Sequence, residues 1–142
     1  MLSKVNFQYL ISYLGLFPFI IVLVNKYFFF SINVEVSQIF IIFYSNIIIV
    51  FIGALNWNID KNINNLKVIY GFLPSLFSLI IIILYLNNHK YEVLIIFIMI
   101  FFIIQLFCDY LISYIKKINK TAFIYLRLPL TSLIILCLFL IK

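Results

Sequence analysis

The chain alternates between long apolar runs and short polar segments. Five runs cover approximately residues 9–27, 36–57, 68–86, 91–115 and 122–141. Each is close to the roughly 20 residues that an α-helix needs to cross about 30 Å of hydrocarbon. The runs are too long and too continuously apolar for membrane barrel strands, which alternate over about ten residues. The pattern predicts an all-α membrane protein, with five transmembrane helices in one compact up-down bundle spanning residues 1–142.

Composition supports a membrane environment. Of the residues, 67% are hydrophobic and 10% are charged, whereas a soluble domain is about 45–50% apolar and about 25% charged. So few charges cannot cover a surface that faces water. The net charge of +6 would favour nucleic acid as a partner of a soluble protein. Here the lysines lie between the apolar runs, so we expect the lipid bilayer, and not nucleic acid, as the partner.

The lysines predict how the chain is oriented. One side of the membrane would carry six of them and the other side three: Lys4, Lys61, Lys67, Lys116, Lys117 and Lys120 against Lys26, Lys90 and Lys142. The positive-inside rule then places the amino terminus in the cytoplasm and the carboxyl terminus outside. No small-residue cleavage site follows the first apolar run, so we expect the first helix to be retained rather than removed as a signal peptide.

Two charged residues lie inside the predicted helices. A charge at mid-bilayer costs about 2.5–3.5 kcal/mol on insertion scales, which makes such residues functional candidates. Asp109 lies seven residues before Lys116, and Arg127 lies six residues after Thr121. Both charges should therefore lie roughly 9–10 Å from the same membrane face. We expect an ion pair between Asp109 and Arg127, because pairing offsets the cost of desolvation.

Further polar residues share helix faces with this pair. Gln105 and Ser113 lie four residues on either side of Asp109, and Thr131 lies four residues after Arg127. Such stripes should face protein rather than lipid. The second helix has Asn46, Gly53, Asn56 and Trp57 on one broad side, and the third has a small-residue face of Gly71, Ser75 and Ser78. We call the candidate functional residues the polar cluster: Asn56, Trp57, Gln105, Asp109, Arg127 and Thr131.

The three prolines lie one in each odd-numbered helix. Each removes a backbone hydrogen bond and frees the carbonyl four residues earlier. The prolines are Pro18, Pro74 and Pro129, and the freed carbonyls are those of Leu14, Tyr70 and Tyr125. In lipid a freed carbonyl needs a partner. The sequence thus predicts a polar, kinked cytoplasmic half and an outer half that is nearly all apolar.

Catalytic and metal-binding motifs are absent from the sequence. It has no HExxH, CxxC or GxSxG motif and no phosphate-binding glycine loop. The single histidine, His89, falls in a predicted polar loop, and Cys108 and Cys137 have no partner at metal-site spacing. We expect no cofactor, no metal and no enzymatic activity. An acid–base site at Asp109 is the one catalytic alternative.

Short motifs over nearly the whole chain suggest a family. They are Tyr13-Leu14-Gly15-Leu16-Phe17-Pro18-Phe19, Gly53-Ala54-Leu55-Asn56-Trp57, Leu73-Pro74-Ser75-Leu76, Gln105 with Asp109, and Leu126-Arg127 with Leu130-Thr131. In this order they resemble the uncharacterised bacterial and mitochondrial membrane protein family that includes transmembrane protein 69 (domain of unknown function 3429). The resemblance implies a multi-pass protein of the bacterial inner membrane, with the mitochondrial inner membrane as the alternative. It implies no established activity.

Two positions depart from the family pattern. Asn56 stands where the family usually has a histidine, and the aromatic pair before the Leu-Arg motif is only partly kept, as Ala122-Phe123. Asparagine can replace the hydrogen bonding of a histidine but not its proton transfer. The departure favours a structural polar network over proton chemistry.

Two functions remain as hypotheses. The first is a non-enzymatic accessory or interaction protein, with a membrane-protein partner or a second copy of the chain. The alternative is a small transporter or a protein that binds lipid or a small molecule at the polar cluster. A purely structural interpretation also stays open, in which Arg127 reaches lipid phosphates beside Asp109 and Trp57 anchors the membrane interface.

Overall fold

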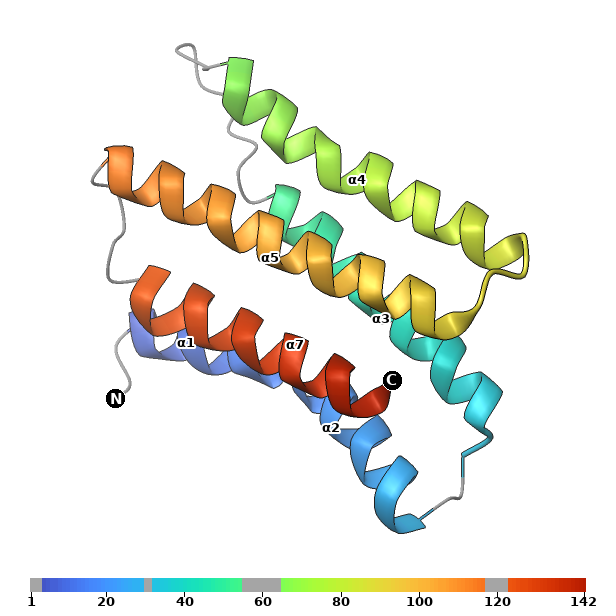
Figure 1. Cartoon of the computed structure of the whole chain (residues 1–142). Helices are drawn as coiled ribbons and strands as arrows, with labels where there is room; N and C mark the ends of the chain where they lie inside the picture. The colour runs from blue at the N-terminus through green and yellow to red at the C-terminus, as the bar shows by residue number, and fades with distance from the viewer. Residues whose placement is uncertain (1–3, 30–31, 55–64, 117–122) are drawn as a thin grey trace. The chain divides into compact units, whose positions relative to one another are not determined.

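The computed structural model describes residues 4–29, 32–54, 65–116 and 123–142 (Figure 1). The ordered elements are α1 (Lys4–Leu14), α2 (Phe17–Val24), the π-helical turn η1 (Asn25–Phe29), α3 (Val34–Ala54), α4 (Asn65–Leu86), α5 (Tyr91–Lys116), the π-helical turn η2 (Phe123–Arg127) and α7 (Leu128–Ile141). All the secondary structure in these ranges is helical. The all-α fold class is confirmed.

Five helical spans are long and apolar enough to cross a membrane. They are Tyr9–Phe28, Val34–Ala54, Val68–Leu86, Tyr91–Leu111 and Phe123–Ile141. The protein is therefore a multi-pass membrane protein, as the hydrophobic pattern predicts. The predicted helix ends at residues 55–57 and 122 lie outside the described ranges.

The chain divides into two compact units. One comprises Met1–Val34 and Met99–Lys142, and the other comprises Glu35–Ile98. We call them the terminal unit and the central unit. The terminal unit contains the first and last spans, and the central unit contains α3 and α4.

In the terminal unit the first span is interrupted. The amide nitrogens of Gly15 and Leu16 donate to the carbonyls of Ser12 and Tyr13 (3.2 and 3.0 Å), which closes α1 with a tight turn. A new helix then begins at Phe17, with Pro18 in its first turn. The sequence interpretation of Pro18 as a kink inside a helix is wrong, because a proline in the first turn loses no helical hydrogen bond.

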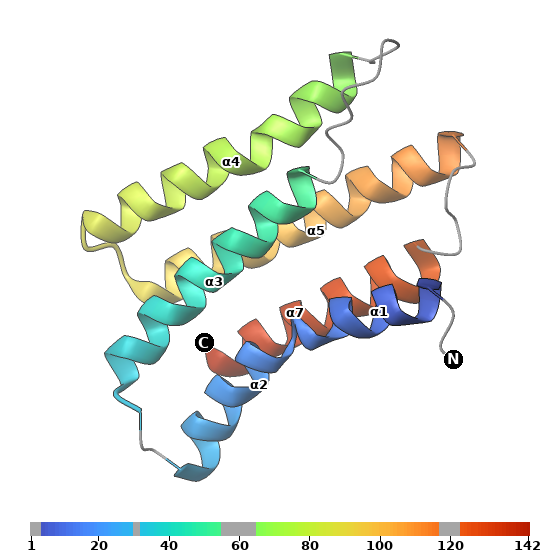
Figure 2. The same ribbon diagram turned by 180° about the vertical axis from the view of Figure 1, so that it is seen from behind.

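The last span contains an irregularity but no break. The π-turn η2 ends at Arg127, and α7 continues directly from Leu128. Pro129 lies six residues into the helical run Phe123–Ile141, so it is an interior proline, as expected. In both views α7 runs beside α1 and α2 (Figure 1, Figure 2). Its inward face carries Thr131, Ile134, Leu138 and Ile141, which are all buried.

In the central unit α3 and α4 run antiparallel (Figure 2). They approach closely where Gly53 of α3 faces α4. A Cβ atom added at Gly53 would lie 2.7 Å from Pro74 Cγ and 2.9 Å from the Gly71 carbonyl oxygen. Pro74 lies inside α4, which continues from Asn65 to Leu86, so this proline is the interior one that the sequence predicts. A glycine at position 53 is thus what permits the short distance between the two helices.

Candidate functional site

The expected ion pair is present in the terminal unit. Nε of Arg127, the last residue of η2, donates a hydrogen bond to Oδ2 of Asp109 on α5. The two side chains are only 16% and 12% exposed. In the apolar interior of a membrane, neither charge is stable without the other. The pair therefore ties the start of the last span to α5.

The local backbone explains how Arg127 is placed. A π-helical turn contains one residue more than an α-helical turn. Here the turn comprises Phe123–Arg127, and α7 follows it without a break. The second residue of α7, Pro129, has no amide proton to donate. The hydrophobic pattern of the last run shows no sign of this extra residue, so sequence analysis missed it.

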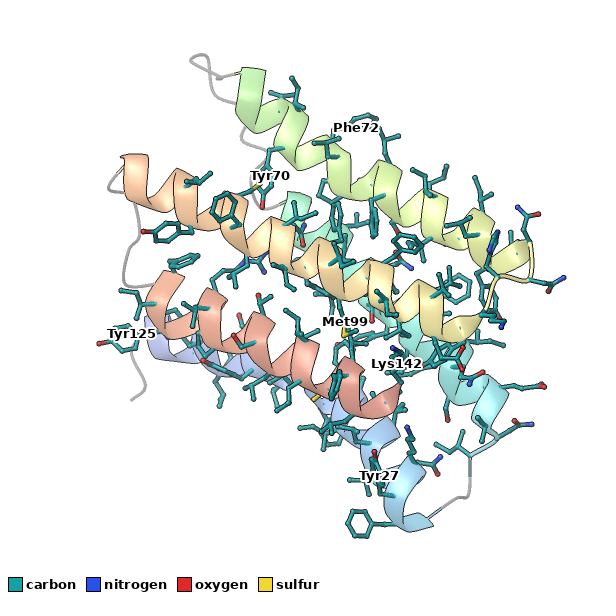
Figure 3. The ribbon with its side chains drawn as sticks, viewed as in Figure 1. Tyr27, Tyr70, Phe72, Met99, Tyr125 and Lys142 are labelled. Atoms are coloured by element: carbon teal, nitrogen blue, oxygen red, sulfur yellow. The ribbon has the colours of Figure 1, made fainter. Side chains whose placement is uncertain are left out.

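A hydroxyl group satisfies one of the carbonyls freed by proline. The Tyr13 hydroxyl donates to the backbone oxygen of Tyr125 at 2.8 Å. Tyr125 is the residue four positions before Pro129, and its carbonyl is the one predicted to need a partner. The sequence predicts that the Tyr125 carbonyl needs a hydrogen-bond donor. It does not predict that Tyr13 is the donor, because the two residues are 112 positions apart in the sequence. Figure 3 shows Tyr125 at the η2 end of the last span.

Of the other four members of the polar cluster, the structure describes two. Gln105 and Thr131 are buried, at 1% and 0% exposed. Each lies one helical turn from a member of the ion pair, Gln105 before Asp109 and Thr131 after Arg127. Asn56 and Trp57 lie outside the described residues.

Two buried polar atoms near the pair lack a partner in the described part of the chain. They are Nη2 of Arg127 and Oγ1 of Thr131. Since Nε of the same guanidinium holds Asp109, the far end of that group retains donors that the pair does not use. Buried polar groups are nearly always hydrogen-bonded in proteins. The unused donors are therefore the chemically distinctive feature of the cluster.

A second polar contact in the terminal unit was missed by sequence analysis. Lys26 Nζ donates to the backbone oxygens of Leu140 and Ile141 (3.0 and 2.8 Å), and the Tyr27 hydroxyl also donates to Leu140 (2.9 Å). Together they cap the final carbonyls of α7, an end that favours positive charge. Figure 3 shows Tyr27 and Lys142 at this end of the unit. From the sequence, Lys26 contributes only to the predicted orientation.

The side chain of Asn25 forms hydrogen bonds with the backbone of Ile32. Asn25 is buried, and its amide makes reciprocal hydrogen bonds with the backbone of Ile32: Nδ2 donates to the Ile32 oxygen (3.2 Å), and the Ile32 nitrogen donates to Oδ1 (3.0 Å). This contact joins the start of η1 to a residue two positions before α3. It explains why a polar residue is retained near the end of an apolar run.

Comparison with known families gives one match. The model of a family described as "Protein of unknown function (DUF3429)" matches residues 6–141. No curated protein and no solved structure matches the chain. The family match covers both units and every member of the polar cluster. A link to transmembrane protein 69 stays an expectation from the motifs.

Proposed function

We propose that this chain, which belongs to the DUF3429 family of unknown function, is a non-enzymatic accessory or interaction protein of an energy-transducing inner membrane. The observation that carries the proposal is the closed Asp109–Arg127 pair. Nε of Arg127 donates to Oδ2 of Asp109 and so joins the start of the last span to α5. The pair is thus better suited to joining helices than to acid–base catalysis.

The outward surface supports an interaction role. Many large apolar side chains on the spans are exposed, among them Phe51 (62%), Phe107 (60%) and Phe139 (66%). In a membrane these residues face lipid or the helices of another protein. Association between such helices depends on packing and on a few polar contacts.

Gentle extraction into lipid nanodiscs followed by native mass spectrometry tests the proposal. We expect a second protein, or a second copy of the chain, to remain bound. A strictly monomeric particle with no bound protein would contradict the proposal. The double variant Asp109→Leu/Arg127→Leu serves as the matched control. If its partner is retained, the pair has a structural role, and if its partner is lost, the pair contributes to the interface.

A second candidate function is the binding of a lipid headgroup or another small anion. It is favoured by the unused donors of Arg127 Nη2 and Thr131 Oγ1, which lie one helical turn apart. Guanidinium and hydroxyl groups together suit a phosphate or a carboxylate. The test compares native mass spectra in nanodiscs of phosphatidylglycerol and of phosphatidylcholine. Retention of phosphatidylglycerol that is lost in Thr131→Val supports this function, and equal retention of both lipids contradicts it.

The membrane of residence belongs to the same proposal. The motifs favour the bacterial inner membrane, with the mitochondrial inner membrane as the alternative. Fractionation of the source cells with antibodies to the chain would distinguish the two, and recovery in any other membrane would contradict both.

A further inference from the structure

The two ends of the terminal unit are held together in different ways. At one end α2 packs against α7, and Phe19, Val22 and Leu138 are buried between them and their neighbours. At the η2 end, no residue of η2 is buried, and no side chain of α1 that the structure describes is buried. Helices in a membrane associate through packing and hydrogen bonds. The η2 end is therefore the less stable end of the unit.

The exposure of its side chains defines an inward face of α1. Tyr9, Ser12 and Tyr13 are only partly exposed, and their spacing of three and four residues places them on one face of the helix. The large apolar side chains on the opposite side are 52–61% exposed: Phe7, Leu10, Ile11 and Leu14. In both views α1 lies beside the start of the last span (Figure 1, Figure 2). The helix thus turns one face toward the unit without burying it.

A break in the first span separates α1 from α2. Gly15 and Leu16 lie between the two helices, and their amides donate to carbonyls only three residues earlier. No side chain caps the start of α2, and Pro18 has no amide proton to donate to the carbonyl of Leu14. A tight turn of this kind within a helical stretch often marks a hinge. The chain can therefore bend at Gly15 and Leu16 more easily than within either helix.

A hydrogen bond attaches the last turn of α1 to η2. The Tyr13 hydroxyl donates to the Tyr125 oxygen at 2.8 Å, and Tyr125 lies two residues before Arg127 in the same π-turn. We call this hydrogen bond the latch. The net strength of one hydrogen bond is small, because water or another partner competes for both groups when it breaks. The latch can therefore hold α1 in place and still open reversibly.

We propose that α1 is a hinged arm that turns about Gly15 and Leu16 and is latched to η2 by the Tyr13 hydroxyl. When the latch opens, α1 leaves η2 while α2 stays packed against α7. This movement uncovers one side of η2, the turn that carries Arg127. The device goes beyond the proposed interaction role and does not depend on it, since all of these residues lie within the terminal unit.

The experiment measures how often the inward face of α1 is uncovered. The full chain is placed in nanodiscs, with Cys108 and Cys137 replaced by alanine, and one reporter cysteine is introduced at a time. Ser12→Cys places the reporter on the inward face, and Ile11→Cys places it on the outward face at nearly the same depth. Both are treated with a water-soluble maleimide, and peptide mass spectrometry gives the two labelling rates. Their ratio, Ser12 to Ile11, increases with the fraction of time that the arm is open.

Removing the latch should raise this ratio. In Tyr13→Phe we expect an increase of about fivefold, as the loss of one hydrogen bond of typical net strength would produce. Tyr9→Phe is the matched control, because it removes a hydroxyl from the same face one turn earlier and leaves the latch intact. Its ratio should equal that of the wild type. An unchanged ratio in Tyr13→Phe would overturn the proposal.

Stiffening the hinge should have the opposite effect. Pro18→Ala restores an amide proton that can donate to the carbonyl of Leu14 and so continue α1 into α2. We expect the labelling ratio to fall at least about twofold below the wild type, because bending then breaks a helical hydrogen bond. An equal or higher ratio would contradict a hinge at this position. If Tyr13→Phe does not fold, the Pro18→Ala result alone decides between the two.

Amide hydrogen exchange distinguishes a turning arm from an unfolding one. If α1 turns as a rigid helix, Tyr13→Phe raises the labelling ratio while the amides of α1 keep their protection. If α1 unfolds instead, labelling and exchange increase together, and the proposal is overturned. Neither measurement depends on a bound partner, so a failure here and a failure of the proposed interaction role are separate results.

Discussion

Replacing Gly53 by alanine should weaken the contact between α3 and α4. The new Cβ would lie 2.7 Å from Pro74 Cγ and 2.9 Å from the Gly71 carbonyl oxygen, whereas ordinary contact begins at 3.4 Å. The helices would need to separate by roughly 0.7 Å, the difference between 2.7 and 3.4 Å. Neither a proline ring nor a backbone carbonyl can rotate aside as a flexible side chain would. Local rearrangement is therefore expensive.

The magnitude follows from two opposing effects. Overpacking a well-packed interior costs about 1–3 kcal/mol. Alanine is favoured over glycine within a helix by about 0.5–1 kcal/mol, which offsets part of that cost. We expect Gly53→Ala to lower the free energy of unfolding by about 1–2 kcal/mol. The assay is equilibrium unfolding in mixed micelles with increasing dodecyl sulfate, followed by circular dichroism.

Two further variants make the test specific. Ala54 is exposed on the adjacent position, so Ala54→Val adds volume on the lipid side and should change stability little. Adding Pro74→Ala to Gly53→Ala removes the closest atom, Pro74 Cγ, but leaves the Gly71 oxygen, so stability should recover in part. The reasoning is refuted if Gly53→Ala is as stable as the wild type under conditions in which the assay resolves other core variants.

Three other predictions concern the terminal unit. Asp109→Leu should lower the free energy of unfolding by about 3 kcal/mol, because it leaves the Arg127 charge buried without its partner. The double variant with Arg127→Leu should be near neutral. A double variant less stable than the single one would contradict the pairing. Lys26→Met should speed amide hydrogen exchange in the last turn of α7 and cost about 1 kcal/mol, and unchanged exchange would exclude a capping role. Tyr13→Phe should cost about 1 kcal/mol in the same unfolding assay, because the Tyr125 carbonyl loses its donor, and an unchanged midpoint would show that another donor replaces it.

Hydropathy alone was enough to predict the five spans. Each apolar run had the length that a bilayer requires, and polar residues marked the boundaries. The cost of an intramembrane charge was enough to predict the pairing of Asp109 with Arg127, because both had to lie at similar depth on consecutive helices. These inferences rest on energies that are large and depend little on detailed packing.

Finer features depended on contacts that no local pattern contains. Pro18 begins a helix because a tight turn precedes it, and the last span contains a π-turn just before Pro129. The hydrophobic pattern of an apolar run is the same whether or not its helix contains such an irregularity. The donors Tyr13 and Lys26 act on residues more than 100 positions away, so their roles follow from the three-dimensional arrangement alone.

The cap that Lys26 and Tyr27 form on α7 has a consequence for biogenesis. Lys26 and the carbonyl of Leu140 are separated by 114 positions in the chain. A ribosome adds about 5–20 residues per second, so the first span enters the membrane several seconds before its partner exists. During that interval the Lys26 ammonium has no carbonyl to bind and must remain with lipid phosphates or water. The terminal unit can therefore be completed only after the last span has been synthesised and inserted.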